Sequence, residues 1–138
     1  AIIITIGLGI SNFILKELIL ASTVCNSGFA FYAADAGVEC AEYWDDIFDR
    51  HGGTVFDDPP PGTNLWCDGR RISVNRNGSF SSFNFSLGGG ERDPYVEVEV
   101  AKTLDATVHT AAGYNTGDQG SPKRVERTIR ASYANEPD

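Results

Sequence analysis

The sequence predicts an α+β fold in which one long N-terminal α-helix packs on a C-terminal antiparallel β-sheet of four to five strands. Residues 1–50 contain no proline and their glycines stand singly, so nothing in this stretch ends a helix. From Arg71 onward apolar and polar residues alternate with the period of two that is typical of strands with one buried face. A sheet of this kind needs a cover, and the second half of the helix is the candidate.

The first part of the helix, residues 1–27, is apolar almost all round and is interpreted as a stalk. This pattern is typical of a helix surrounded by lipid or by other helices. The apolar run before Lys16 and Glu17 is shorter than the roughly 20 residues that span a membrane, so we expect further apolar residues before Ala1. A cleaved signal peptide is disfavoured because the start carries no basic residue. A buried core helix is the remaining alternative.

The second part of the helix, from residue 28, changes to a two-faced pattern and begins the predicted globular head, residues 28–138. Spacings of three and four place apolar residues on one stripe and acidic residues on another. We expect the apolar stripe to face the sheet. It consists of Phe29, Ala33, Ala36, Cys40, Tyr43 and Ile47, and the acidic stripe of Asp35, Glu39, Glu42, Asp46 and Asp49.

The helix is predicted to end at His51, where a glycine pair follows the last periodic residue. A loop over residues 51–70 comes next, because three consecutive prolines at 59–61 exclude regular structure. A β-meander over residues 71–133 completes the head, and Asn77-Gly78 between two alternating runs predicts a hairpin. The predicted strands are Arg71–Arg76, Ser79–Leu87, Tyr95–Lys102, Thr107–Ala111 and Lys123–Tyr133.

Composition and motif spacing favour a protein without a catalytic centre. The net charge of −8 argues against nucleic-acid binding through the bulk surface, which requires a basic face. Three cysteines match neither a zinc ligand set nor a CxxC motif, and His51 and His109 lack partner spacing, so no metal site is predicted. No phosphate loop or nucleophile elbow occurs. We therefore expect no enzymatic activity and no cofactor.

The acidic stripe has two interpretations. It is most simply a solvated helix face. Its alternative role is to pair with arginines of the last strand, within one subunit or on a neighbouring subunit, and such exposed pairs set register more than affinity. The residues of these candidate pairs are Asp35, Glu39, Glu42, Arg124, Arg127 and Arg130.

The architecture of an apolar N-terminal helix, a loop and an antiparallel meander resembles that of the type IV pilin family. Its most specific part is the helix block Ala30-Phe-Tyr-Ala-Ala-Asp-Ala-Gly37, which runs on to Tyr43 and Trp44. Gly113-Tyr-Asn-Thr and Arg124-Val-Glu-Arg-Thr-Ile-Arg are similar, less specifically, to the family's terminal strands. Thr5 departs from the glutamate usual at the fifth mature position, which again suggests that Ala1 is not the mature start.

The resemblance implies a structural subunit that resides in the inner membrane, is processed by a prepilin peptidase, is methylated at its N-terminus and is assembled by pilus machinery into a homopolymeric helical filament. Such a surface filament serves adhesion, motility or DNA uptake. A minor pilin, a secretion-system pseudopilin and a membrane-tethered domain that never polymerises are the alternatives. The stalk residues expected to pack in the filament core are Ile2, Ile3, Ile4, Ile6, Leu8, Ile10, Phe13, Ile14, Leu15, Leu18 and Ile19.

Export implies an oxidising setting, in which one disulfide and one free thiol are the natural outcome for three cysteines. A Cys40–Cys67 bridge would tie the loop across the helix and contribute about 3 kcal/mol in a chain-entropy estimate. Two separate buried thiols are the alternative. Cys25 falls in the stalk and is expected to be a small packing residue.

Overall fold

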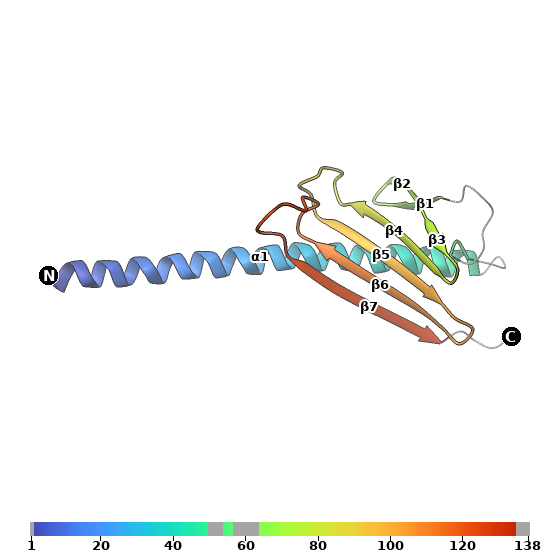
Figure 1. The fold of residues 1–138 in the computed structure, drawn as a ribbon, viewed down its shortest axis with the longest axis horizontal. Coiled ribbons are helices and arrows are strands. Elements are labelled where there is room, and N and C mark those ends of the chain that lie inside the picture. The colour runs from blue at the N-terminus through green and yellow to red at the C-terminus, as the bar shows by residue number, and fades with distance from the viewer. Residues whose placement is uncertain (1, 50–53, 57–63, 135–138) are drawn as a thin grey trace.

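The predicted fold class is confirmed by a computed structural model, in which one long helix packs on an antiparallel sheet (Figure 1). The structure describes the backbone of residues 2–49, 54–56 and 64–134, and the side chains of these residues except 2–9 and 47–49. The described elements are α1 (Ile2–Asp49), β1 (Asn64–Cys67), β2 (Arg70–Ser73), β3 (Asn75–Asn77), β4 (Phe80–Ser86), β5 (Tyr95–Lys102), β6 (Ala106–Tyr114) and β7 (Glu126–Ala134).

The helix α1 forms over 48 residues without interruption, as predicted from the absence of proline. At 1.5 Å per residue its length is roughly 70 Å. Its second half lies across one face of the sheet, whereas its first half projects beyond the sheet as a stalk (Figure 1). The chain therefore has an extended stalk and a head that share one continuous helix.

The main sheet of the described residues is a meander in which β3, β4, β5, β6 and β7 follow each other in sequence order and every neighbouring pair is antiparallel. Between β3 and β4, Asn77 pairs with Phe80, so the hairpin loop is Gly78-Ser79. The predicted hairpin is thus confirmed, but its two loop residues are Gly78 and Ser79 instead of Asn77 and Gly78. Gly78 has φ +64° while Ser79 does not have positive φ, which fits a type II′ turn with glycine at its first central position.

The prediction of one strand over residues 71–76 preceded by an irregular loop was wrong. This stretch is divided at Val74 into β2 and β3, and β2 forms a separate two-stranded sheet with β1. Asp68 and Gly69, with φ values of +50° and +68°, form the connecting turn. Asp-Gly between short strands is a strong hairpin signal that the sequence analysis overlooked. Cys67, expected before the first strand, is the last residue of β1.

The helix face that contacts the sheet also differs from the predicted stripe. Ala33 is fully buried as expected, and Ala36 and Cys40 are partly buried. Phe29 and Tyr43, also expected to be buried, are half or more exposed, and Ile47 lies outside the described side chains. The buried face is rotated towards small residues, because a close approach of helix and sheet excludes aromatic rings. It consists of Ala30, Ala33, Ala34, Gly37, Val38 and Ala41.

The helix and the sheet approach each other most closely at two glycines, Gly113 of β6 and Gly37 of α1. A methyl group at Gly113 would lie closer than 3.0 Å to backbone atoms of Ala30 and Ala34. A methyl group at Gly37 would meet side chains of Val96 and Val98. The rest of the core comes from the inward faces of the strands, including Phe83, Phe85, Val100 and Ala111, and from Val55, Phe56, Leu65 and Ile72.

Candidate assembly surfaces

The first candidate surface is the described part of the stalk, residues 10–24, whose large apolar side chains are uncovered. These side chains are between 49% and 67% exposed. Consecutive residues on a helix point about 100° apart, so runs such as Phe13-Ile14-Leu15 cover all sides of the rod. The exposed residues are Ile10, Phe13, Ile14, Leu15, Leu18, Ile19, Leu20 and Val24.

The head therefore does not cover the apolar side chains of the stalk over residues 10–24. The side chains of the other predicted packing residues, Ile2, Ile3, Ile4, Ile6 and Leu8, lie outside the described residues. Cys25 is a free, exposed cysteine on this stalk. Among the described residues, one helical segment, Ile10–Asp46, has the length and composition needed to cross a membrane, and little of its most apolar window is buried.

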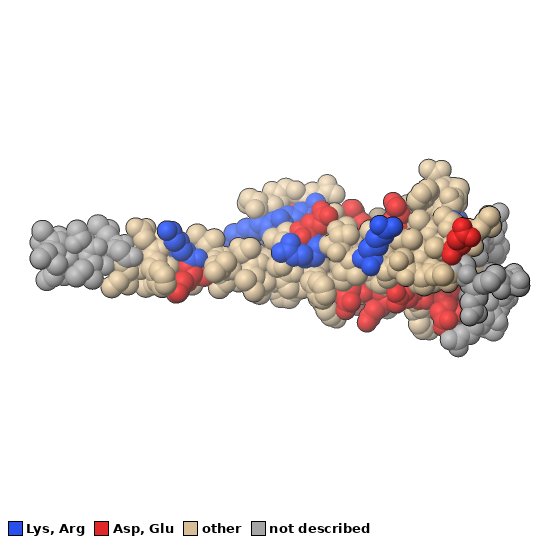
Figure 2. Space-filling model, turned by 90° about the horizontal axis from the view of Figure 1, so that it is seen from below, with Lys and Arg blue, Asp and Glu red and all other residues tan. Residues whose placement is uncertain are grey.

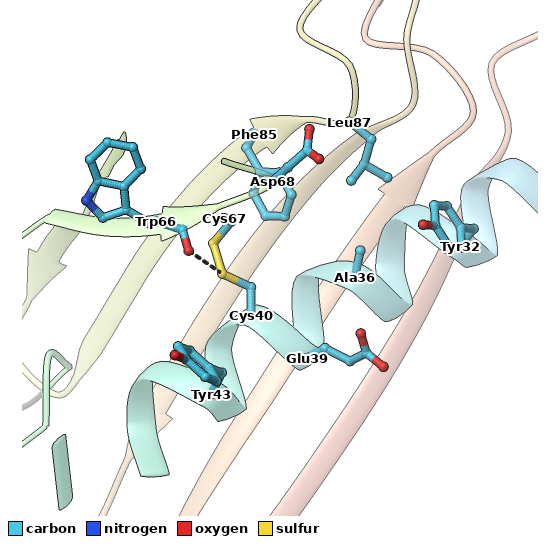
Figure 3. Close-up of a pocket in the computed structure, with 10 residues that line it drawn as sticks. All are labelled: Tyr32, Ala36, Glu39, Cys40, Tyr43, Trp66, Cys67, Asp68, Phe85 and Leu87. Carbon is cyan, nitrogen blue, oxygen red and sulfur yellow. Dashed lines mark hydrogen bonds between the residues drawn. A yellow bond between two sulfur atoms is a disulfide. The ribbon is translucent and has the colours of Figure 1, made fainter. Parts of the chain in front are cut away.

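The second candidate surface is a groove of about 410 Å³ on the head, between α1 and β1 (Figure 3). Tyr32, Ala36 and Tyr43 form a row along the helix side, and Trp66 of β1 stands on the opposite side. The three aromatic side chains are each more than half exposed. The other lining residues are Glu39, Cys40, Cys67, Asp68, Phe85 and Leu87.

The Cys40–Cys67 disulfide, predicted from the sequence, is present and lies at the base of this groove, with a Cα–Cα distance of 5.9 Å. The Sγ atom of Cys40 is 3.8 Å from the carbonyl oxygen of Trp66. This is a packing contact rather than a hydrogen bond, because a disulfide sulfur carries no hydrogen. The same carbonyl accepts a hydrogen bond of 3.0 Å from Nε1 of Trp44. Helix and hairpin are thus joined both covalently and by a hydrogen bond.

Asp35, Glu39, Glu42 and Asp46 of the helix are exposed. Acidic side chains gather along one edge of the head, and basic side chains lie on the adjoining surface (Figure 2). Asp35, Glu39 and Glu42 form no ion pair with another described residue. The arginines predicted to pair with them have other contacts. Nε of Arg127 donates to Oγ of Ser27 at 2.8 Å, and the guanidinium of Arg124 lies 3.7 Å above the ring of Tyr114.

The candidate charge pairs, which also include Arg130 on the exposed outer face of β7, are thus not formed within the described part of one subunit. Pairing between subunits stays a prediction. The exposure of the acidic row agrees with its interpretation as a solvated face in an isolated chain.

A buried polar cluster that was not predicted from the sequence lies at the end of the head away from the stalk. Asp45 of α1 is 4% exposed, and its carboxylate forms an ion pair of 2.8 Å with Nζ of Lys102 on β5. The hydroxyl of Tyr133 on β7 donates to the same carboxylate at 2.5 Å and lies 3.1 Å from Nε2 of the fully buried His109 on β6. Lys102 also donates to Oγ1 of Thr54 at 3.0 Å.

This cluster connects the helix to three strands. Burial by itself raises the pKa of Asp45, but hydrogen bonds from His109, Lys102 and Tyr133 and the charge of Lys102 hold it well below its ordinary value. The carboxylate is therefore ionised, with Lys102 as its ion-pair partner and Tyr133 as a hydrogen-bond donor, as a structural connector requires. Position 45 follows Ala41 by four residues and so lies on the buried face, but the sequence does not show which helix face is buried.

Among the described residues no group of three or more His, Cys, Asp or Glu side chains could hold a metal ion. Comparisons with known proteins find no matching protein family, curated protein or solved structure.

Proposed function

We propose that the chain is a structural subunit of a type IV pilus-like filament on a bacterial cell surface, which resides in the inner membrane before assembly and polymerises through its N-terminal helix. The observation that carries this proposal is the apolar stalk, exposed on every side over residues 10–24. An uncovered apolar surface of this extent is typical of a site that contacts membrane or protein.

The charged pair in the stalk favours assembly over permanent residence in lipid. Lys16 and Glu17 are exposed and are the only charged residues before Asp35. Each costs about 2.5–3.5 kcal/mol at the centre of a bilayer, whereas neighbouring subunits in a filament can supply opposite charges. Adjacent residues on a helix point in different directions, so these two charges face different neighbours.

The remainder of the head has the properties of a filament surface. Its helix and sheet are connected by the disulfide and by the Asp45 cluster, which suits a subunit that must keep its shape in a polymer. The net charge of −8 makes direct DNA binding the least supported of the roles expected of such filaments. Adhesion and motility, which depend on outer-surface contacts, fit this surface better.

The test compares the same substitution at two exposed leucines. Leu18→Asp, on the stalk, should abolish fibres seen by electron microscopy in material sheared from expressing cells, because it places a carboxylate in a packed apolar interface. Leu104→Asp is the matched control, since Leu104 is 97% exposed in the β5–β6 connection of the head. It should leave fibres unchanged.

Abundant fibres that contain only this chain would identify it as a major subunit. Short fibres that carry this chain only at one end would identify it as a minor pilin or pseudopilin. A detergent-solubilised chain that stays monomeric, forms no fibres on cells and tolerates replacement of its stalk by an unrelated spanning helix would refute polymerisation. That result would favour the membrane-tethered domain.

A further inference from the structure

Two segments of α1 carry complementary residues at identical spacing. Phe13, Lys16 and Leu20 are exposed on one face of the stalk at intervals of three and four residues. Ala36, Glu39 and Tyr43 line the groove of the head at the same intervals. A displacement of about 23 residues converts one set into the other. Intervals of three and four keep side chains on one helix face, as in packed parallel helices.

The groove has a recess where the stalk has a large side chain. Ala36 is small and half-buried, and it lies on the helix between the exposed rings of Tyr32 and Tyr43 (Figure 3). Trp66 and Leu87 line the groove on its other side. A ring such as that of Phe13 fits between two aromatic neighbours above an alanine, in the manner of a knob entering a hole.

Charge is complementary at the next position. Glu39 is exposed at the edge of the groove and forms no ion pair with a described residue, and Asp68 adds a second carboxylate to the lining. Lys16 is the only cation in residues 1–49. Its neighbour Glu17 points about 100° away around the helix, so the lysine has no carboxylate on its own side of the stalk.

We infer that the groove receives the stalk of a second copy of this chain, in parallel orientation, with Phe13 above Ala36, Lys16 against Glu39 and Leu20 against Tyr43. The inference rests on the proposed filament and specifies its subunit register. The two copies are displaced along the helix axis by 23 residues, or about 35 Å.

Neighbouring registers that keep the same helix faces are less complementary. A displacement shorter by four residues also sets Lys16 against a carboxylate, that of Asp35, but it sets Phe13 against the ring of Tyr32 and Leu20 against Glu39. A displacement longer by three sets Lys16 against Glu42, but it sets Phe13 against Glu39. Both bury an apolar residue against a carboxylate, which leaves that charge without a partner in an apolar contact. The displacement of 23 residues avoids this and also sets Gly9 opposite Tyr32.

The contact also explains how assembly continues. Twenty-three residues at 100° each leave the stalk face and the groove face about 140° apart around the same rod. A copy that docks its stalk in one neighbour therefore keeps its own groove open for another. Such a heterologous contact does not close on itself and generates an open filament.

The first test exchanges charges in the full-length chain. Lys16→Glu should raise the concentration needed for polymerisation at least about tenfold, because like charges then meet in an apolar contact. Adding Glu39→Lys should restore assembly. Adding Glu42→Lys instead should not, because Glu42 is exposed on the same helix but does not line the groove. An exchange of Lys16 and Glu17 within one chain should not restore it either.

The second test measures proximity directly. In a Cys25→Ser background, Phe13→Cys together with Ala36→Cys should give a ladder of cross-linked subunits with a short bismaleimide, which leaves the Cys40–Cys67 disulfide intact. Ile14→Cys together with Ala36→Cys is the matched control. Ile14 is similarly exposed but points about 100° away, so this pair should give no ladder.

The outcomes separate the register from the proposed function. Rescue by Glu39→Lys together with a ladder confined to the Phe13 and Ala36 pair supports the register. Normal polymerisation of Lys16→Glu, rescue by the Glu17 exchange, or equal ladders from both cysteine pairs would overturn the register while the filament stands. An unaltered chain that forms no polymer would overturn the filament, and the register with it.

Discussion

The close contact between α1 and strands β5 and β6 predicts that one substitution, glycine to alanine, has graded effects at three positions. At Gly113 the added methyl group would overlap the carbonyl oxygen of Ala30 and backbone atoms of Ala34. At Gly37 it would meet methyl groups of Val96 and Val98, at 2.6 and 2.9 Å. At Gly28, on the exposed side of the helix, it would meet nothing within 4 Å.

The physical nature of each neighbour sets the magnitude. Backbone atoms cannot rotate away, so Gly113→Ala must displace the helix from the sheet and should cost about 3 kcal/mol, the upper part of the range for overpacked cores. Gly37→Ala displaces side chains and gains up to about 1 kcal/mol of helix propensity, so we expect a net loss of about 1 kcal/mol. Gly28→Ala should leave stability unchanged or raise it by up to about 1 kcal/mol.

The assay is urea unfolding of the detergent-solubilised full-length chain, followed by tryptophan fluorescence, with the midpoint and slope measured for all three variants. Equal stability of Gly113→Ala and Gly28→Ala would show that the helix does not approach β6 as closely as described. A changed slope would indicate an altered unfolded state instead, and circular dichroism would then compare the native states.

Three further predictions concern the connections within the head. Because hydrogen bonds and Lys102 hold the pKa of Asp45 below its ordinary value of 3.8, the unfolded chain binds the proton first as pH falls. The contribution of ionised Asp45 to the free energy of unfolding is therefore complete above about pH 4 and declines below it. Asp45→Asn should reduce this dependence of stability on pH and should lower the free energy of unfolding by about 3–5 kcal/mol at pH 7. Urea unfolding of the unaltered chain and of Asp45→Asn at pH 3 and pH 7 measures both effects. An equal loss of stability on acidification in both proteins would contradict the role of Asp45. Tyr133→Phe removes the hydroxyl that donates to Asp45 and should cost about 1–3 kcal/mol, and an unchanged urea midpoint would exclude this role. Paired Cys40→Ser and Cys67→Ser changes should cost about 2–4 kcal/mol, whereas a loss no larger than that from Cys25→Ser would show that the bridge contributes little.

The local elements of this protein could be predicted from sequence because local chemistry determines them. The absence of proline gives the long helix, and the alternation in β4 and β5 gives strands with one buried face. Glycine at position 78 gives the turn before β4. Asp68-Gly69 is an equally strong hairpin signal, and it would have predicted the turn between β1 and β2.

The choice between helix faces could not be made from spacing alone. Both Phe29–Tyr43 and Ala30–Ala41 form stripes at intervals of three and four, and the larger residues are the more hydrophobic. Only the sheet decides between them, because Gly113 lets the helix approach so closely that a ring has no room. Ala36, Cys40 and Tyr43 of the larger stripe then line the groove, where a partner can reach them.

The sequence by itself determined that a long apolar helix precedes an antiparallel meander, and that two cysteines could join them. The tertiary structure alone decided that Asp45 is buried, since Lys102, His109 and Tyr133 reach it from three different strands. The tertiary structure also decided which side of α1 stays exposed to solvent. Hydrophobic periodicity reports that a helix has a face to bury, but the shape of the opposing surface determines which face fits.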